Sequence, residues 1–382
     1  MGTPLHPAVR ELEQLIADDA VVRMYFERMI DEVPRGRQYR NRHLQSVPQL
    51  LRLVDEVMTM APEFSEDSTV MLPLGAILDW TMATPAGFAA YRDPRVNAAL
   101  QRILNAWCDF LTSSASRYVL NDSASGWKSP AARRAIGIEQ YQHDAQDEHW
   151  GFASWNDFFT RRFLAGARPV ASPKDDKVIV SACESTPFAL ATNVQRCDSF
   201  WLKSQPYSLR DMLAGDRSTD SFVGGTVYQA FLSATNYHRW HSPVAGTIVR
   251  AVVVPGTYYS EPDSEGSQAS DPKVAQAYLA HVAARAVFII DADDPVIGLV
   301  AFVPVGMSEV SSCVIDPTVA AGRHVDKGDD LGYFQFAGST HCLVFQPGAI
   351  DSFALPATPR THGAPAPLVL VRSELARAAT HR

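Results

Sequence analysis

The sequence lacks long apolar runs and an excess of basic residues. No apolar stretch approaches the ~20 residues needed to cross a bilayer, and the N-terminus shows no basic segment followed by an apolar one. Lys and Arg number 34 against 42 Asp and Glu, so the formal net charge is −8. We therefore expect no stable membrane anchor and no secretion signal, and neither nucleic acid nor an anionic membrane as the main partner.

Cysteine is also scarce. The five cysteines are an odd number, lie far apart and form no C-x-x-C pair. This pattern predicts reduced thiols in a cytoplasmic protein, with neither a disulfide framework nor a zinc site. With 382 residues, of which 46% are apolar, the chain is long enough for two domains and a large core.

The first third of the chain has the apolar periodicity of helices. The clearest case is residues 93–111, where Asp93 is placed to cap a helix, Pro94 follows at its first position and apolar residues recur at helical spacing. Two earlier stretches, residues 7–30 and 48–60, show the same pattern. These features predict a helical N-terminal domain.

The pattern changes after residue 150. Ser154 and Ser208 are each placed to cap a short helix. β-branched runs separated by Gly, Pro and Asp are typical of strands and occupy residues 247–256, 286–306, 343–348 and 367–372. The predicted class is α+β, with a helical domain, a polar linker and a β-rich domain over residues 1–125, 126–150 and 151–382.

Two stretches of the β-rich half carry residues suited to acid–base or nucleophilic chemistry. In one, Gly338-Ser339-Thr340 separates two apolar runs; an ordinary loop is the simplest interpretation, since a hairpin turn would more naturally be Asn-Gly or Asp-Gly. In the other, His238 and His241 lie three positions apart in a strand-to-loop bend. They are either buried histidines bonded to the backbone or include a general base beside a nucleophile. A zinc site would need a third ligand, which nothing nearby supplies.

A carboxylate stands in a third stretch. Glu184 lies inside a small, apolar, strand-like run, where a buried carboxylate is costly unless it is paired. It is either a solvent-facing residue at a strand end or the group that orients a histidine, as in a serine triad. Ser339 lacks the G-x-S-x-G elbow of a hydrolase, but a serine in a strained turn can also attack the carbonyl that precedes it.

Several segments of the chain resemble a known family. Four segments, in the family's order, resemble the signatures of the phosphatidylserine decarboxylases: "SWNDFFTRRFLAGARPV", "FWLKSQPYSLRDML", "NYHRWHSPVAGTI" and "GDDLGYFQFAGSTHCLVFQPGAI". The N-terminal segment "ILDWTMATPAGFAAYRDPRVNAALQRILNAWCDFL" and the tetrapeptide "ACES" resemble the soluble, tryptophan-decarboxylase-like branch.

The resemblance implies a self-cleaving zymogen. Ser339 would attack the carbonyl of Gly338, the chain would break between them, and Ser339 would become a pyruvoyl group that decarboxylates its substrate through a Schiff base. By position, His241 would be the base for self-cleavage, Glu184 its carboxylate partner, and His238 a helper in decarboxylation. The two resulting chains would stay associated, and we expect Ser339 to lie near both histidines, with the helical domain beside them.

Two positions depart from the family pattern. The family usually has Asp where this chain has Glu184, and commonly has Asp where this chain has Asn236. One extra methylene group at Glu184 could still reach His241, so the identity of the orienting carboxylate stays open.

The substrate is predicted from the loop over residues 258–278. This loop is acidic and polar, which suits a mobile lid over a small ligand, and Glu261, Asp263 and Glu265 would repel an anionic lipid. We therefore expect a free, aromatic amino acid, with tryptophan favoured by the branch resemblance alone. A phosphatidylserine decarboxylase and a non-catalytic binding relative are the alternatives.

Overall fold

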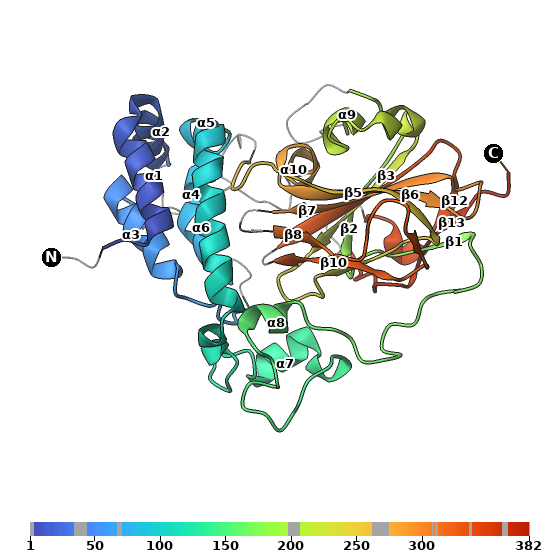
Figure 1. Cartoon of the computed structure of the whole chain (residues 1–382), viewed down its shortest axis with the longest axis horizontal. Coiled ribbons are helices and arrows are strands. Elements are labelled where there is room, and N and C mark those ends of the chain that lie inside the picture. Colours follow the sequence, from blue (N-terminus) through green and yellow to red (C-terminus); the bar gives the residue numbers. More distant parts are fainter. Residues whose placement is uncertain are drawn as a thin grey trace.

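The computed structural model of the protein combines a helical N-terminal region with a β-rich region (Figure 1). The structure describes residues 4–33, 44–66, 71–197, 207–261, 275–307, 309, 312–335, 338–360 and 366–381. This arrangement confirms the predicted α+β class. The N-terminal helices are α1 (Pro7–Asp18), α2 (Ala20–Asp31), α3 (Val47–Val57), α4 (Pro73–Met82), α5 (Pro85–Ala90) and α6 (Pro94–Thr112).

Local capping decides where these helices begin. Asp93 accepts a hydrogen bond from the Arg95 N–H at 2.8 Å and Pro94 occupies the first position, so α6 starts as predicted. The helical pattern predicted over residues 7–30 is confirmed, and two helices, α1 and α2, occupy that range. Asp19 separates them: its carboxylate accepts from two N–H groups at the start of α2, which fixes a new N-terminus there.

The predicted linker is a packed segment. It contains α7 (Pro130–Ile136), and its Trp127, Ile138 and Trp150 are buried in the same apolar cluster as the N-terminal helices. The Trp127 indole N–H also donates to the carbonyl of Pro62 at 2.8 Å. The apolar core is therefore continuous across residues 125 and 150, and the domain boundaries at these residues stay predictions.

A seven-stranded antiparallel sheet forms the centre of the β-rich region. Its strand order is β2-β3-β11-β7-β6-β5-β9. The strands are β2 (Thr186–Thr192), β3 (Thr226–Leu232), β11 (Ser339–Phe345), β7 (Leu299–Gly306), β6 (Arg285–Ala292), β5 (Gly246–Val254) and β9 (His324–Val325). The strands predicted over residues 247–256 and 286–306 are confirmed as β5 and as the β6–β7 pair, and residues 343–345 end β11.

Two three-stranded sheets complete this region. One has the order β1-β13-β12 and the other β4-β10-β8. Their strands are β1 (Val178–Val180), β13 (Glu374–Ala378), β12 (Ile350–Phe353), β4 (Arg239–His241), β10 (Asp330–Gln335) and β8 (Ser312–Ile315). The strand predicted over residues 367–372 is wrong: only Val369 forms a bridge, to Ser185, and the chain turns at Arg372, whose φ is +66°.

Alternate residues of β11 face different layers. Leu343 belongs to the large apolar cluster shared with the N-terminal helices, whereas Val344 belongs to the cluster under α9 (Leu209–Met212) and α10 (Gln276–Val282). Because side chains alternate along a strand, Ser339 lies on the face of Leu343. The Ser154 hydroxyl caps α8 (Trp155–Phe159) as predicted; Ser208 precedes α9 without a capping bond.

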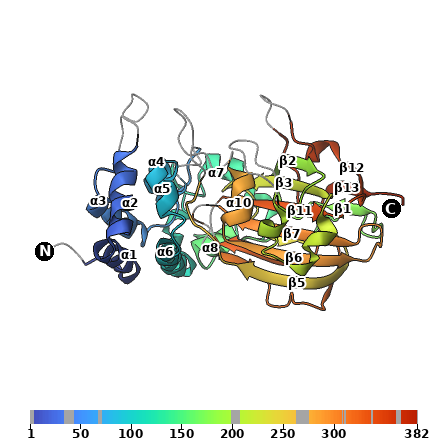
Figure 2. The ribbon, with the colours of Figure 1, turned by 90° about the horizontal axis from the view of Figure 1, so that it is seen from above.

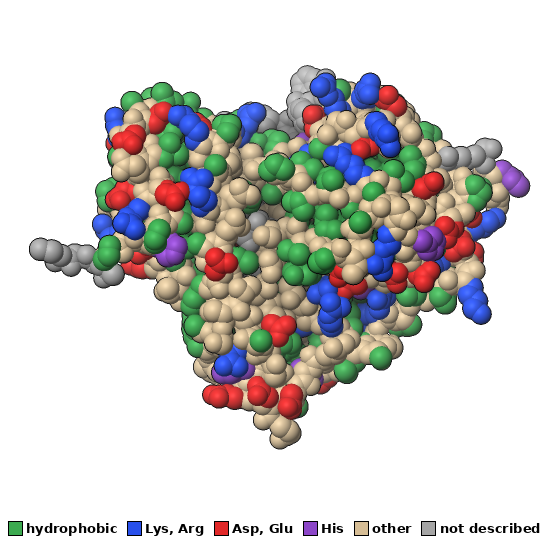
Figure 3. Space-filling view, in the orientation of Figure 1, with side chains coloured by type: hydrophobic (Ala, Val, Ile, Leu, Met, Phe, Trp, Pro, Cys, Tyr) green, Lys and Arg blue, Asp and Glu red, His purple; other side chains and the backbone are tan. Residues whose placement is uncertain are grey.

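The inner helices stand against the ends of the central strands. In Figures 1 and 2, α4, α5 and α6 lie between the outer helices α1–α3 and the sheet. Asn97 of α6 accepts from the Tyr258 N–H at 2.8 Å, and Phe88 of α5 packs on Tyr278 of α10. Acidic and basic side chains are interspersed on the face shown in Figure 3. Among the described helices, none is both long and apolar enough to cross a bilayer.

Candidate active site

The predicted scissile pair lies where the chain passes from one sheet to another. β10 pairs with β4 and β8, whereas Ser339 begins β11, between β3 and β7. Ser339 lies opposite Leu232 of β3 and Gly306 of β7. Ser339 and Thr340 are therefore the first residues of a buried strand, and they form neither a hairpin turn nor an ordinary surface loop.

Ser339 has a buried hydroxyl with no hydrogen bond. Its side chain is fully buried, and its Oγ has no partner within the described parts of the chain. An unpaired buried polar group costs about 1–3 kcal/mol, so the position is poorly explained by stability. A Cβ on Gly338 would meet its nearest atom, the Leu232 carbonyl oxygen, at 3.9 Å. Packing alone does not require glycine there, but the missing side chain removes one group that could hinder attack on the Gly338 carbonyl.

His238 lies in the aromatic layer beside the β3–β4 connection. Its ring stacks on Phe159 of α8 with centroids 4.1 Å apart, and its Nε2 lies 3.4 Å from the Ala234 carbonyl oxygen. Burial, reinforced by the charge of Arg161, lowers the pKa of His238 to about 3. The imidazole is therefore neutral at pH 7 and can accept or donate a hydrogen bond.

His241 ends β4 and has partners at both ring nitrogens. Its Nδ1 lies 2.9 Å from the Gly328 carbonyl oxygen, and its Nε2 lies 2.9 Å from the Tyr237 hydroxyl. Arg372 Nη2 also lies 3.2 Å from Nδ1. The nearer Gly328 carbonyl can only accept a hydrogen bond, so we assign the ring proton to Nδ1, and the Nε2 lone pair then accepts from Tyr237. Burial, with the nearby Arg372 guanidinium, lowers the pKa of His241 to about 3. Tyr237 thus occupies the nitrogen that a general base would use.

The expected contact between Glu184 and His241 is absent. Glu184 is buried and forms a bidentate pair with Arg168, with N–O distances of 2.7 and 2.8 Å. Its Oε2 also lies 3.4 Å from the Val371 N–H. In this structure Tyr237 and Gly328 hold the His241 ring, so a role of Glu184 in orienting it stays a prediction. The Arg168 partner lies in one of the segments that resemble the family.

The fold brings His238 and Ser339 to the same end of the sheet. Leu232, opposite Ser339, ends β3, and the connection that follows holds His238. On the other side, the Phe334 N–H donates to the His238 carbonyl at 3.0 Å. Phe334 lies in β10, the strand that precedes Ser339 in the sequence. No hydrogen bond links Ser339 to His238 or His241 within the described ranges, so their catalytic roles stay predictions.

Two further buried groups of the β-rich region were not expected. His341 lies on the same face of β11 as Ser339, is fully buried, and has no partner at either nitrogen among the described residues. Glu309, in the β7–β8 connection, is also fully buried. The alternation of β11 could have revealed His341. No sequence pattern marks Glu309, whose surroundings depend on α4.

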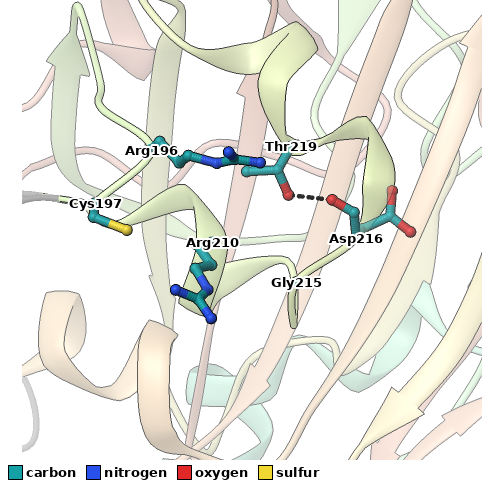
Figure 4. A pocket seen from close by; sticks show the side chains of 6 residues that line it. All are labelled: Arg196, Cys197, Arg210, Gly215, Asp216 and Thr219. Atoms are coloured by element: carbon teal, nitrogen blue, oxygen red, sulfur yellow. Dashed lines mark hydrogen bonds between the residues drawn. The ribbon is translucent and has the colours of Figure 1, made fainter.

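A surface pocket of about 310 Å³ lies elsewhere, beside α9 (Figure 4). Its charged groups are largely paired: Arg196 with Asp220, and Asp216 with Arg250. It contains none of the predicted catalytic residues. Its lining residues are Arg196, Cys197, Arg210, Gly215, Asp216 and Thr219.

Known proteins share most of this chain. Two phosphatidylserine decarboxylase family models match residues 6–136 and 155–362. The chain is 40% identical over 335 residues to decarboxylase iboD of Amanita muscaria, covering 79% of this chain and 94% of that protein. It is 34% identical over 363 residues to an L-tryptophan decarboxylase of Psilocybe cubensis, covering 88% and 79%.

A more distant relative shares about half of the chain. Phosphatidylserine decarboxylase proenzyme 3 of Schizosaccharomyces pombe is 32% identical over 203 residues, which cover 53% of this chain and 20% of that protein. The second family model alone spans more than half of the chain and includes Ser339, His238 and His241. The chain therefore belongs to the phosphatidylserine decarboxylase family, and it is a carboxy-lyase.

Proposed function

We propose that this protein is a pyruvoyl-dependent decarboxylase of a free, aromatic L-amino acid, matured by cleavage between Gly338 and Ser339. The observation that carries the proposal is the Ser339 hydroxyl, which is buried, has no partner among the described residues and directly follows a glycine with open space at its Cβ position. The family membership supports it.

Self-cleavage uses groups of this chain and one water molecule. The Ser339 Oγ–H bond breaks as Oγ bonds to the Gly338 carbonyl carbon; the C–N bond between the two residues then breaks and the nitrogen takes up the proton, so an ester replaces the amide. β-Elimination removes the Ser339 Cα proton and breaks the Cβ–O bond, which frees a chain that ends at the Gly338 carboxylate, and water then converts the resulting dehydroalanine to the pyruvoyl group with loss of ammonia. A base must take the hydroxyl proton. We assign that role to His241. Because the Tyr237 hydroxyl donates to the His241 Nε2, Tyr237 must either move away from this nitrogen or relay the serine proton to it. His238, neutral and stacked beside the β3–β4 connection, is assigned to the decarboxylation step.

The environment of Ser339 suits a pyruvoyl group. Such a group supplies a ketone that condenses with a primary amine and withdraws electrons from the amine's α-carbon. Gly306 faces Ser339 from β7 and leaves the strand uncrowded on that side. Ser339 is fully buried and lies on the apolar face of β11, and such surroundings favour loss of a carboxylate as CO₂.

The sheet supports the association of the two cleaved chains. β11 would belong to the C-terminal chain, yet it lies between β3 and β7 of the N-terminal chain and pairs with both along its full length. β13 likewise pairs with β1. These ladders would survive the break at Gly338, so we propose that the mature enzyme remains one folded unit in the cytoplasm.

The choice of a free amino acid rests on the relatives. The Psilocybe relative is named an L-tryptophan decarboxylase and covers both regions of this chain, whereas the named phosphatidylserine decarboxylase from Schizosaccharomyces matches only half. The argument from the acidic loop is weaker than expected, because Glu261 is buried and faces no solvent. Asp263 and Glu265 lie outside the described residues.

A substrate panel tests this function. Purified protein should release CO₂ from an aromatic L-amino acid, with tryptophan the first choice, and should stay in the supernatant with anionic vesicles. CO₂ release from phosphatidylserine vesicles, but from no free amino acid, would favour the lipid decarboxylase instead. An unbroken, inactive chain with no carbonyl group would point to a non-catalytic relative.

A further inference from the structure

Glu309 lies in a connection whose two ends are tied to the scissile segment. β7 ends at Gly306, which pairs with Ser339, and β8 begins at Ser312, which pairs with Gln335 of β10. Glu309 is midway between these two paired positions in the sequence. The topology therefore places Glu309 three residues from the strand position that lies opposite Ser339.

The carboxyl group of Glu309 is buried, and only one of its two oxygens has a hydrogen-bond partner among the described residues. Its Oε1 accepts a hydrogen bond from the Gly75 N–H at 2.5 Å, in the first turn of α4. Its Oε2 has no partner within the described ranges, although the side chain is fully buried. The nearby Tyr259 hydroxyl is also buried and unpartnered, and its pKa is raised by burial and by Glu309. A hydrogen-bond donor or a cation is thus missing from this position.

The chemistry of this carboxyl suits an amine ligand. Burial raises the pKa of Glu309 to about 8, against which the Gly75 and Leu74 N–H groups act weakly. An ammonium ion beside Oε2 would supply both the charge and the donor that the site lacks, and would favour the ionised carboxylate. A group with a pKa near that of its partner is an effective acceptor of a proton from it.

We propose that Glu309 is a further catalytic residue, which binds the substrate's ammonium group at Oε2 and takes one proton from it. This inference rests on the proposed function. An N–H bond of the ammonium group breaks and an O–H bond forms at Glu309, so the nitrogen regains the lone pair that it needs to attack a carbonyl. The proposed ligand class is therefore a primary amine, whatever its side chain.

A purely structural role for Glu309 is the competing explanation, and Glu32 supplies the comparison. The Glu32 Oε2 accepts from the Ala86 N–H at 2.7 Å in the first turn of α5, and its Oε1 pairs with Arg28 at 3.2 Å. Both carboxyls therefore cap a helix of the same region. Only Glu309 has an oxygen left over, so a glutamine substitution should affect the two sites differently.

The test compares Glu309→Gln with Glu32→Gln in the self-cleaved enzyme. Glutamine can still accept from the Gly75 N–H, so both variants should fold and cleave, as intact mass would show. Calorimetry then measures binding of two ligands: the N,N-dimethyl derivative of the product amine, which is cationic but cannot form an imine, and the alcohol with a hydroxyl in place of the amino group.

We expect wild type and Glu32→Gln to bind the cation at least ~10-fold more tightly than the alcohol. Glu309→Gln should lose this preference and about 100-fold in kcat/KM, the usual effect of removing a general base. An unchanged preference and kcat/KM in Glu309→Gln would overturn the inference while leaving the proposed function intact. Failure of wild type to release CO₂ from any amino acid would instead overturn the proposed function.

Discussion

The helical region and the β-rich region treat their buried polar groups differently. In the helical region the buried Thr81, Thr84 and Asn97 all have hydrogen bonds, and no buried side-chain N or O atom without a partner occurs over the described residues between 4 and 136. In the β-rich region, Ser339 and His341 have none within the described ranges. Since native proteins satisfy nearly all such groups, the exceptions indicate where function overrides stability.

Among the substitutions proposed, Ser339→Ala should have the largest effect. It removes the nucleophile, so the chain should stay uncleaved and inactive, and loss of an unpaired hydroxyl should leave stability unchanged or slightly higher. In the helical region the matched change Thr84→Ala removes a helix cap and should cost about 1 kcal/mol while cleavage proceeds. Intact mass and urea unfolding measure both effects. Cleavage of Ser339→Ala would exclude this serine as the nucleophile.

The two histidines should separate maturation from turnover. His241→Ala removes the proposed base and should slow self-cleavage by about 100-fold or more. His238→Ala should still cleave but turn over poorly, because its role is assigned to decarboxylation. A time course of intact mass, followed by CO₂ release from the cleaved fraction, distinguishes the two. The assignment is reversed if His238→Ala is the variant that stays uncleaved.

Arg168→Ala should destabilise the β-rich region. It leaves the buried Glu184 without its bidentate partner, and breaking such a pair typically costs about 3–5 kcal/mol. Arg168→Met combined with Glu184→Leu should recover most of this loss, because neither charge then remains buried. Urea unfolding measures the stability. If the double variant still cleaves at the wild-type rate, Glu184 has no part in maturation.

His341 should make the protein sensitive to acid. Burial lowers the pKa of His341 to about 3, below the unfolded value near 6.5, so the unfolded chain binds more protons between these values. Stability is full above pH ~6.5 and falls as the pH drops toward 3. Between pH 7 and pH 5 one such histidine contributes a loss of about 2 kcal/mol, which His341→Leu should remove.

The exposed His324 provides the control for this effect. Its hydrogen bond to Asp293 raises its pKa, so its contribution is present at low pH and is lost as the pH rises through that value. His324→Gln should therefore leave the acid loss as large as in wild type or larger. An equal acid loss in wild type and His341→Leu, measured by urea unfolding at both pH values, would contradict the assignment of a buried neutral His341.

The parts of the fold that the sequence predicts are those fixed by local chemistry. Asp93 and Pro94 define the start of α6 whatever surrounds them, and β-branched runs mark β5, β6 and β7. The break at Asp19 was overlooked although a capping residue was present, because the apolar periodicity continues across it. Packing could not be predicted: the segment after Trp127 is largely polar, yet its Ile138 and Trp150 side chains are buried in the same cluster as the helices.

The candidate site divides in the same way. Family signatures pointed to Ser339, His238 and His241, and all three side chains are buried in the structure. The partners of the charged groups depend on tertiary contacts instead. Arg168 pairs with Glu184, which lies 16 residues further along the chain, and Gly75 of α4 donates to Glu309, which lies 234 residues further along. No local pattern carries that information.

Intact-mass analysis of the purified wild-type protein, paired with CO₂ release from L-tryptophan, is the most direct test of self-cleavage between Gly338 and Ser339. We predict two chains, residues 1–338 and 339–382, the second starting with a carbonyl-reactive group in place of Ser339. Activity should rise with the cleaved fraction. A fully active protein that shows a single unbroken 382-residue mass and no carbonyl-reactive group would contradict it.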